Sequence, residues 1–315
     1  MTENTNKEKQ AGDYLNKFLD DTKDTLSEIK NTMVDNKAPS LEFLNVDLEQ
    51  LPLGIFYRLG TQIKIRAAKV VEIQKYSIID DKNFLDVTEK MNQLLSSCVK
   101  VVLPGGKNGS YKDVKDGDRL YLIFMIRELT FQKGNSLAKE VKCDFCNNEF
   151  KIPFRATSNS EQAKTFESHE MPEKLKKYFD VELKCFIFNI EGVKYKLAPP
   201  TIGIQETFFT NIKENVKAEK TPNVSFLKII PYMLYDRTTI TDDGIKEKED
   251  EFKRMDMKTF QILNQAVDKM IFGLKGLKMK CPECKTEEVC TTMSFPDGAS
   301  SLFVIPDFFD KFIEE

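Results

Sequence analysis

Two short cysteine motifs are the residues of this chain whose types and spacing point most directly to chemistry. Cys143 and Cys146 stand in VKCDFCNNEF, and Cys281 and Cys284 repeat the same CxxC spacing in LKMKCPECKTEEVC. Each pair supplies two thiolates, whereas a structural zinc ion takes four ligands in a tetrahedron. Neither motif has a second pair close to it in the sequence. The two distant motifs together therefore predict one four-cysteine metal site, closed by two separate parts of the chain.

The predicted site is structural, because a closed four-sulfur site has no open position for water or substrate. We expect one structural Zn²⁺ per chain, with iron as an alternative that the sequence leaves open. Four thiolates and one zinc ion carry a net charge of about −2, which nearby lysines would offset in part. These are Lys142, Lys278 and Lys280. Among the other cysteines, Cys290 is expected on a strand beside the site, and Cys98 and Cys185 in the core.

Histidine chemistry is scarce in this chain. The single histidine, His169, lies in the polar stretch SEQAKTFESHEMPEK, and the chain has no tryptophan. A Ser-His-Asp or Cys-His nucleophile would have to use this one residue, which we expect to be exposed. Catalysis by carboxylates has no supporting motif, so we expect neither an enzyme nor a small-molecule substrate.

Composition excludes several further classes. The 315 residues are 41% hydrophobic, and 47 basic against 50 acidic residues give a net charge of −3, which offers no general attraction to nucleic acid or membrane. No apolar run reaches the length of a spanning helix, and the polar N-terminus does not resemble a signal peptide. We therefore expect a soluble protein made in a cytoplasm. In that reducing setting the seven cysteines are better interpreted as metal ligands and buried thiols than as disulfides.

A weak internal repeat predicts the architecture. GTQIKIRAA (60–68) matches GVKYKLAPP (192–200), and a helical region follows each, the first including NFLDVTEKMNQLLSSCVKVVL. Asp118 and Asp256 each open an apolar helix 25 positions before the first cysteine of the next CxxC motif. We interpret this as a diverged tandem duplication of a strand, helices, a capped helix and a cysteine knuckle. The predicted fold class is α+β, with two such modules joined by a zinc-ribbon-like site.

The predicted domains follow from this repeat. Residues 1–38 form an N-terminal amphipathic helical arm, 39–155 the first module ending in the knuckle 143–146, 156–180 a polar linker, and 181–315 the second module with the knuckle 281–284 and an aromatic tail. Within the second module, the segment around Glu191-Gly192 is expected to turn a β-hairpin.

Three segments are candidate partner-binding surfaces: the apolar segment LPLGIFY (51–57) and the two terminal segments. In the arm, apolar residues recur at helical spacing over 13–34, as Leu15, Leu19, Leu26, Ile29 and Met33. In the tail, four rings offer apolar area, as Phe303, Phe308, Phe309 and Phe312. For both terminal segments two interpretations stay open: packing on the chain's own body, or docking on a partner chain.

The segments IKIRAAKVVEIQKY, SSCVKVV, DGDRLYLIFMIREL and EVKCDFCNNEFKIPF resemble the zinc-knuckle baseplate hub proteins of T-even-type contractile-tailed bacteriophages. The ending CPECKTEEVCTTMSFPDGASSLFVIPDFFDKF resembles that of larger members. The resemblance implies a non-enzymatic virion or assembly component of a tail baseplate, with other baseplate or tail proteins as partners. It carries over Cys143, Cys146, Cys281 and Cys284, and it leaves open whether the chain stays in the finished particle.

Two other functions have less support in the sequence. A zinc-ribbon nucleic-acid-binding protein is favoured by lysines beside the knuckles, but the balanced charge and the lack of an Arg-rich tract argue against it. A carboxylate-dependent or metal-dependent hydrolase would need an open metal position or a converging carboxylate pair, and the sequence indicates neither.

Overall fold

The computed structural model describes residues 42–131, 137–157, 163–218, 220, 224–234, 239–285, 288–292 and 298–303. The chain divides into two units, Met1–Glu42 and Phe43–Glu315. The predicted amphipathic helix of the arm lies outside the described residues, as do Leu15, Leu19, Leu26, Ile29 and Met33. The second unit combines helices and strands, in agreement with the predicted mixed fold class.

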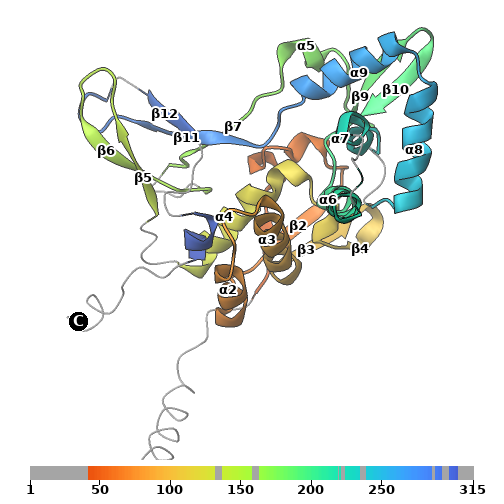
Figure 1. Cartoon of the computed structure of the whole chain (residues 1–315). Coiled ribbons are helices and arrows are strands. Elements are labelled where there is room, and N and C mark those ends of the chain that lie inside the picture. Colours follow the sequence, from red (N-terminus) through yellow and green to blue (C-terminus); the bar gives the residue numbers. More distant parts are fainter. Residues whose placement is uncertain are drawn as a thin grey trace, which may run out of the picture. The chain divides into compact units, whose positions relative to one another are not determined.

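The first part of this unit is an antiparallel sheet of order β1-β2-β3-β4 packed with three helices (Figure 1). The strands are β1 (Leu44–Val46), β2 (Gln62–Ile65), β3 (Val99–Leu103) and β4 (Lys107–Gly109), and the helices are α2 (Val70–Ser77), α3 (Phe84–Cys98) and α4 (Arg119–Thr130). Strand β2 and the start of α4 confirm the sequence-based predictions. The helix predicted through VKVVL is wrong there, because buried Val99 and Val101 alternate with exposed Lys100 and pair with β2 as a strand.

The second part has a sheet of order β10-β9-β8 and a group of helices. The elements are α5 (Glu173–Lys176), β8 (Phe179–Asp180), β9 (Cys185–Ile190), β10 (Val193–Leu197), α6 (Ile202–Lys217), α7 (Val224–Met233), α8 (Asp242–Arg254) and α9 (Met257–Lys269). The predicted hairpin is confirmed: Glu191 and Gly192 join β9 to β10 with φ of 52° and 85°. These positive values suit the mirror-image turns that match strand twist.

Two further sheets extend from these parts. A three-stranded sheet has the order β12-β11-β7, and β5 pairs with β6 as a separate two-stranded sheet. Their strands are β5 (Ala138–Lys142), β6 (Glu149–Pro153), β7 (Phe166–Ser168), β11 (Leu274–Lys280) and β12 (Glu288–Thr292). The last described element is the 3₁₀ helix η6 (Ala299–Phe303).

The apolar residues form two cores that do not follow the predicted domain boundaries. The core around α3 and α4 also takes Phe166, Ile202, Leu277, Leu302 and Phe303. The core around α6 to α9 takes Leu53 and Phe56 from the first half of the chain. The stretch 156–180, predicted as a linker, contains β7, which pairs with β11, and the buried Phe166 and Leu175. These contacts could not be predicted from local pattern, because Phe166 and Leu175 each stand alone among polar residues.

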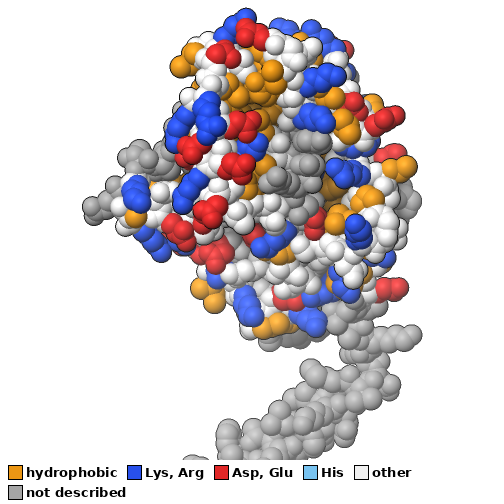
Figure 2. Space-filling view, turned by 90° about the vertical axis from the view of Figure 1, so that its right-hand side faces the viewer, with side chains coloured by type: hydrophobic (Ala, Val, Ile, Leu, Met, Phe, Trp, Pro, Cys, Tyr) orange, Lys and Arg blue, Asp and Glu red, His pale blue; other side chains and the backbone are white. Residues whose placement is uncertain are grey.

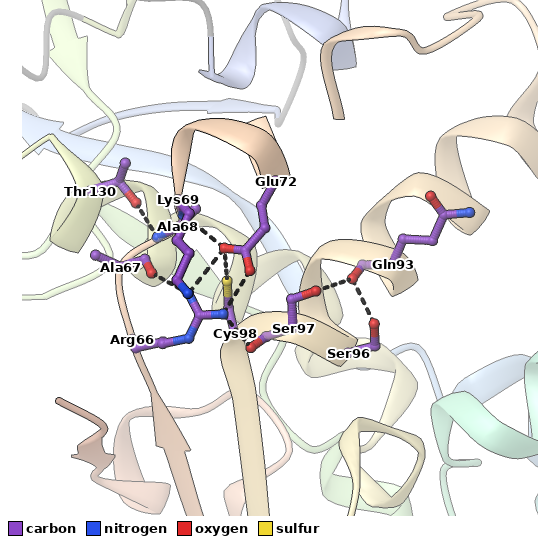
Figure 3. Close-up of polar contacts among 10 residues, drawn as sticks. All are labelled: Arg66, Ala67, Ala68, Lys69, Glu72, Gln93, Ser96, Ser97, Cys98 and Thr130. Carbon is purple, nitrogen blue, oxygen red and sulfur yellow. Dashed lines mark hydrogen bonds and ion pairs between the residues drawn. The ribbon is translucent and has the colours of Figure 1, made fainter. Parts of the chain in front are cut away.

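Arg66 ties the end of β2 to two helices (Figure 3). Its guanidinium forms two hydrogen bonds with the carboxylate of Glu72 on α2, at 2.7 and 3.0 Å, and one with the Ser97 carbonyl on α3, at 2.8 Å. The same carboxylate accepts the backbone N–H of Lys69 at 2.7 Å, at the first turn of α2. Both charged side chains are largely buried, and the hydrogen bonds from Arg66 lower the pKa of Glu72 to about 2.

Removal of Arg66 should therefore be costly. Arg66→Ala leaves the Glu72 carboxylate largely buried without its partner, and we expect a loss of about 3 kcal/mol in the free energy of unfolding. Urea unfolding followed by circular dichroism measures it. The matched control is Lys151→Ala, because Lys151 pairs with Glu140 at 3.2 Å on the surface and exposed pairs contribute little. Equal effects of the two substitutions would contradict this role of Arg66.

Asp118 and Asp256, predicted as equivalent helix caps, have different roles. Asp256 caps α9 as predicted, since its Oδ1 accepts the Thr259 N–H at 2.9 Å. Asp118 precedes α4 but does not cap it. Its fully buried carboxylate accepts the Leu53 N–H at 2.9 Å and the Tyr57 hydroxyl at 2.8 Å. Leu53 belongs to one core and Tyr57 to the other, so Asp118 fastens the segment that passes between the two cores.

The two aspartates should give opposite pH dependences of stability. Burial raises the pKa of Asp118 to about 7. The folded protein then keeps a proton that the unfolded chain releases above about pH 4, so stability from this group falls as the pH rises from about 4 to about 7. The hydrogen bonds from Thr259 lower the pKa of Asp256, so its contribution is present above about pH 4 and is lost as the pH falls.

Urea unfolding across this pH range checks the prediction. Relative to wild type, Asp118→Asn should become progressively less destabilising from about pH 4 to about pH 7, and Asp256→Asn less destabilising as the pH falls below about 4. The quantity compared is the change of destabilisation with pH, because Asp118→Asn also loses a hydrogen-bond acceptor at every pH. Parallel pH profiles for the two variants would show that burial of Asp118 does not control its protonation.

Candidate metal centre

The four motif cysteines come from two hairpin-like pairs of strands, which we call the cysteine ribbon (β5, β6, β11 and β12). Cys143 follows β5 directly, and Cys281 follows β11 directly. The two pairs lie side by side, with β5 next to β12 and β6 next to β11 (Figure 1). The Lys139 ammonium on β5 also donates to the Thr292 carbonyl on β12 at 2.8 Å. The ribbon thus brings together two motifs from opposite halves of the chain.

The sulfur positions fit a tetrahedral metal ion. The Sγ atoms of Cys146 and Cys281 are 3.6 Å apart, and those of Cys143 and Cys284 are 3.9 Å apart. All four sulfurs lie within 4.8 Å of one another. A zinc–sulfur distance of about 2.3 Å places tetrahedral sulfurs about 3.8 Å apart. All four thiols are free, and their separations exceed the length of about 2.05 Å of a disulfide bond. The prediction that the two motifs form one cluster is confirmed.

Both knuckles have the same backbone turn. The Asn147 N–H donates to the Cys143 carbonyl at 2.9 Å, and the Lys285 N–H donates to the Cys281 carbonyl at 3.0 Å. Asn147 and Lys285, each directly after the second cysteine, both have φ of 58°. This left-handed conformation is uncommon outside glycine. Two stretches far apart in the chain thus adopt one turn, which places both cysteines of each motif on the same side.

Backbone N–H groups point at the sulfurs and favour thiolates. Burial raises the pKa of Cys281, but hydrogen bonds from the backbone of Cys284 and Glu283 bring it below its ordinary value. The side-chain amide of Asn148 lies 4.0 Å from the Cys281 sulfur, across the ribbon. Asn148 is a contact that the sequence analysis missed, and its position two residues after Cys146 is the signal that could have suggested it.

Four sulfurs this close require a cation if all are to be charged. The Asn148 N–H lowers the pKa of Cys146, but burial and the three neighbouring sulfurs raise it to about 12. Without a cation the cluster therefore holds protons, because adjacent thiolates repel. A divalent ion reverses this balance and keeps coordinating thiols deprotonated. The donor set, four thiolates with backbone N–H support, fits zinc or iron in chemistry.

The other cysteines lie where the sequence predicted. Cys98 on α3 and Cys185 on β9 are fully buried, and burial raises the pKa of the Cys98 thiol to about 12. Cys290 is exposed on β12, next to the cluster in sequence but outside it. His169, expected to be exposed, is half-buried after β7, where its backbone N–H donates to the Gly273 carbonyl at 3.0 Å.

Among the predicted partner-binding aromatic residues, Phe303 is placed by the structure in the core. It is 1% exposed and packs on Tyr76 and Phe131, with ring centroids 5.0 and 6.2 Å away. This ring is therefore not available to a partner, and the alternative of packing on the chain's own core applies to it. Phe308, Phe309 and Phe312 lie outside the described residues.

A groove of about 420 Å³ lies between α3 and α6. Its most enclosed carboxylate, Glu206, accepts hydrogen bonds from Asn92 at 3.0 Å and from the Tyr111 hydroxyl at 2.8 Å. Lys112 forms an ion pair with the other carboxylate oxygen at 3.2 Å. These contacts join α3 and α6 and occupy both oxygens, which is typical of a structural carboxylate.

Comparisons with models of known protein families, with curated proteins and with solved structures gave no match to this chain. Within the described part of the chain, every helix is too short or too polar to cross a membrane.

Proposed function

We propose that this chain is a non-enzymatic assembly protein whose fold is closed by one structural zinc ion. The observation that carries the proposal is the cluster of Cys143, Cys146, Cys281 and Cys284, with sulfurs within 4.8 Å of one another. Four sulfur ligands leave no vacancy for substrate, so the ion stabilises the fold and does no chemistry. It joins two chain segments that lie, in sequence, on either side of most of the second core, and metal binding there contributes directly to the free energy of folding.

The proposal includes a tandem duplication within the second unit, whose two halves would be the copies. Each half runs through a strand pair, helices, a helix that begins at the predicted aspartate, a strand, a cysteine knuckle and a second strand. The identical φ of 58° after each knuckle and the matching N–H···O=C bonds support a common origin. A metal site built from one knuckle of each half is then the seam between two copies.

The proposed setting is a bacteriophage tail baseplate, as a hub component or an assembly factor. It rests on the resemblance in the segments around both knuckles, and its partners are other baseplate or tail proteins. A metal-closed fold with structural rather than catalytic polar groups suits such a role. Assembly in the host cytoplasm suits a site of reduced thiols.

A nucleic-acid-binding role is the second candidate, because lysines line the cysteine ribbon. Several of them are already paired with acids: Lys151 with Glu140 at 3.2 Å, and Lys278 with Glu288 at 4.0 Å. Figure 2 shows basic and acidic side chains interspersed on the face that carries α8 and β10. Phosphate binding draws on an uninterrupted basic surface, so these pairings favour the assembly role.

Metal analysis tests the zinc proposal. We expect one zinc ion per wild-type chain, and loss of that zinc in Cys143→Ser and in Cys281→Ser alike, because each removes one of four ligands. Elemental analysis of zinc and iron in the purified proteins gives the count. Both variants should also lower the midpoint of thermal unfolding.

Cys290→Ser is the matched control, since Cys290 is exposed on β12 and lies outside the cluster. It should keep one zinc ion per chain. Two zinc ions in the wild-type chain, or loss of zinc in only one of the two knuckle variants, would mean that the knuckles form independent sites. Either result would contradict the proposal that one ion joins the two halves.

The assembly role is tested in the particle. When tails are produced from the genome that encodes this chain, mass spectrometry of purified tails and of baseplate intermediates should find it in at least one of them. Absence from both, together with DNA binding whose affinity falls steeply with salt, would favour the nucleic-acid alternative instead.

A further inference from the structure

Asn148 lies where the two knuckles meet, and three of its polar groups contact them. Its backbone carbonyl accepts the Cys143 N–H at 2.9 Å, and its backbone N–H donates to the Cys146 sulfur. Its side-chain amide lies 4.0 Å from the Cys281 sulfur, within reach of an N–H···S hydrogen bond. The first two contacts close its own knuckle, and the third reaches the other knuckle.

The contribution of this side chain can be separated from that of its backbone. Any residue at position 148 except proline supplies the N–H and the carbonyl that close the first knuckle. The contact with Cys281 needs a side chain that carries a donor. A substitution of Asn148, which is half-buried, therefore removes the contact across the ribbon and keeps the backbone bonds of the turn.

Cys281 receives N–H groups from both knuckles. Backbone N–H groups of Glu283 and Cys284 point at its sulfur from its own knuckle, and the Asn148 amide approaches from the other. A thiolate bound to a metal ion carries negative charge, and hydrogen bonds to a charged acceptor are shorter and stronger than neutral ones. The contact between the amide and the sulfur should therefore shorten when Cys281 binds an ion.

The amide at this position belongs to one knuckle and not to the other. The residue two positions after Cys284 is Thr286, whose side chain has a hydroxyl group and no amide. The two knuckles share the left-handed residue after the second cysteine, but they differ at the next position. Asn148 thus gives the first knuckle a donor group that the sequence of the second does not repeat.

Groups that bond to metal ligands influence metal affinity although they do not touch the ion. They orient the ligand and stabilise its charge, and their removal typically lowers metal affinity about 10-fold to 100-fold. The Asn148 amide can do both for Cys281. It fixes the position of that sulfur relative to the first knuckle, and it places an N–H donor beside a thiolate.

We propose that Asn148 is a positioning residue of the metal site, whose side-chain amide holds the Cys281 sulfur toward the ion that it shares with Cys143 and Cys146. The inference rests on the proposed zinc site and adds to it a residue outside the four ligands. The first knuckle then supplies two ligands of its own and orients a third that comes from the other half of the chain.

Cobalt binding to the full chain tests this role, because Co²⁺ among four sulfurs has visible absorption and a sulfur-to-cobalt charge-transfer band. Asn148→Leu removes the amide without adding charge, and Asn148→Asp keeps the shape but replaces the N–H donor by an acceptor. Both variants should bind Co²⁺ and Zn²⁺ about 10-fold to 100-fold more weakly than wild type in competition with a chelator. The charge-transfer band of Asn148→Leu should move to longer wavelength, because a thiolate without this N–H partner releases its electrons more easily.

Lys139→Met is the matched control. Lys139 also joins the two strand pairs of the ribbon, but its 2.8 Å hydrogen bond ends on the Thr292 carbonyl and not on a sulfur. Loss of this bond should leave the charge-transfer band in place and the metal affinity close to that of wild type.

Three results would contradict the role of Asn148. Wild-type affinity and an unchanged band in both Asn148 variants would overturn this inference and leave the metal site intact. Equal losses of affinity in Asn148→Leu and Lys139→Met, with the band unchanged in both, would show that only the joining of the strands matters. A wild-type chain that binds neither Co²⁺ nor Zn²⁺ would overturn the metal site and this inference together.

Discussion

Mutual repulsion of four cysteine sulfurs is the constraint on which the cysteine ribbon depends. Sulfurs within 4.8 Å of one another cannot all be charged unless a cation lies among them. The raised pKa of Cys146 expresses that repulsion, while the N–H groups aimed at Cys281 act in the opposite direction. The protein supplies part of the stabilisation through its knuckles, and the proposed metal ion would supply the rest. Metal binding would then be coupled to the positions of β5 and β6 against β11 and β12.

Metal binding would affect both cores, because each core contains residues from both halves of the chain. Leu53 and Phe56 belong to the core of the second half, while Leu277 and Phe303 belong to the core of the first. The segment between the knuckles therefore cannot separate as an independent domain. Joining Cys143 to Cys281 restricts a long loop in the unfolded chain, and closing long loops raises stability mainly by this restriction. Asp118 makes a second link between the cores through Leu53 and Tyr57, and this link does not depend on a metal ion.

The sequence predicted the local elements and the metal cluster, because each depends on short-range patterns or on donor type. Alternating apolar residues identified β2, turn residues identified the β9–β10 hairpin, and ligand count identified the four cysteines. The domain boundaries depend on which core each apolar residue joins, and local periodicity carries no such information. Phe166 stands alone in a polar stretch, yet it is buried against Tyr121 and Phe124. The helix predicted through Val99 is wrong because strand pairing with β2 outweighed local pattern.

The two aspartates and the two knuckles show how unequally a proposed duplication can diverge. Asp256 remains a surface cap, while Asp118 has become a buried link between cores. A helix start can be satisfied by many groups, so its aspartate is free to take another role. A knuckle has no such freedom, because two sulfurs and several N–H groups must converge on one ion. The same left-handed residue after each knuckle, Asn147 in one and Lys285 in the other, keeps that convergence although the side chains differ. Backbone conformation is therefore the same at the two knuckles, whereas the aspartates at the matching helix starts differ in what they bind.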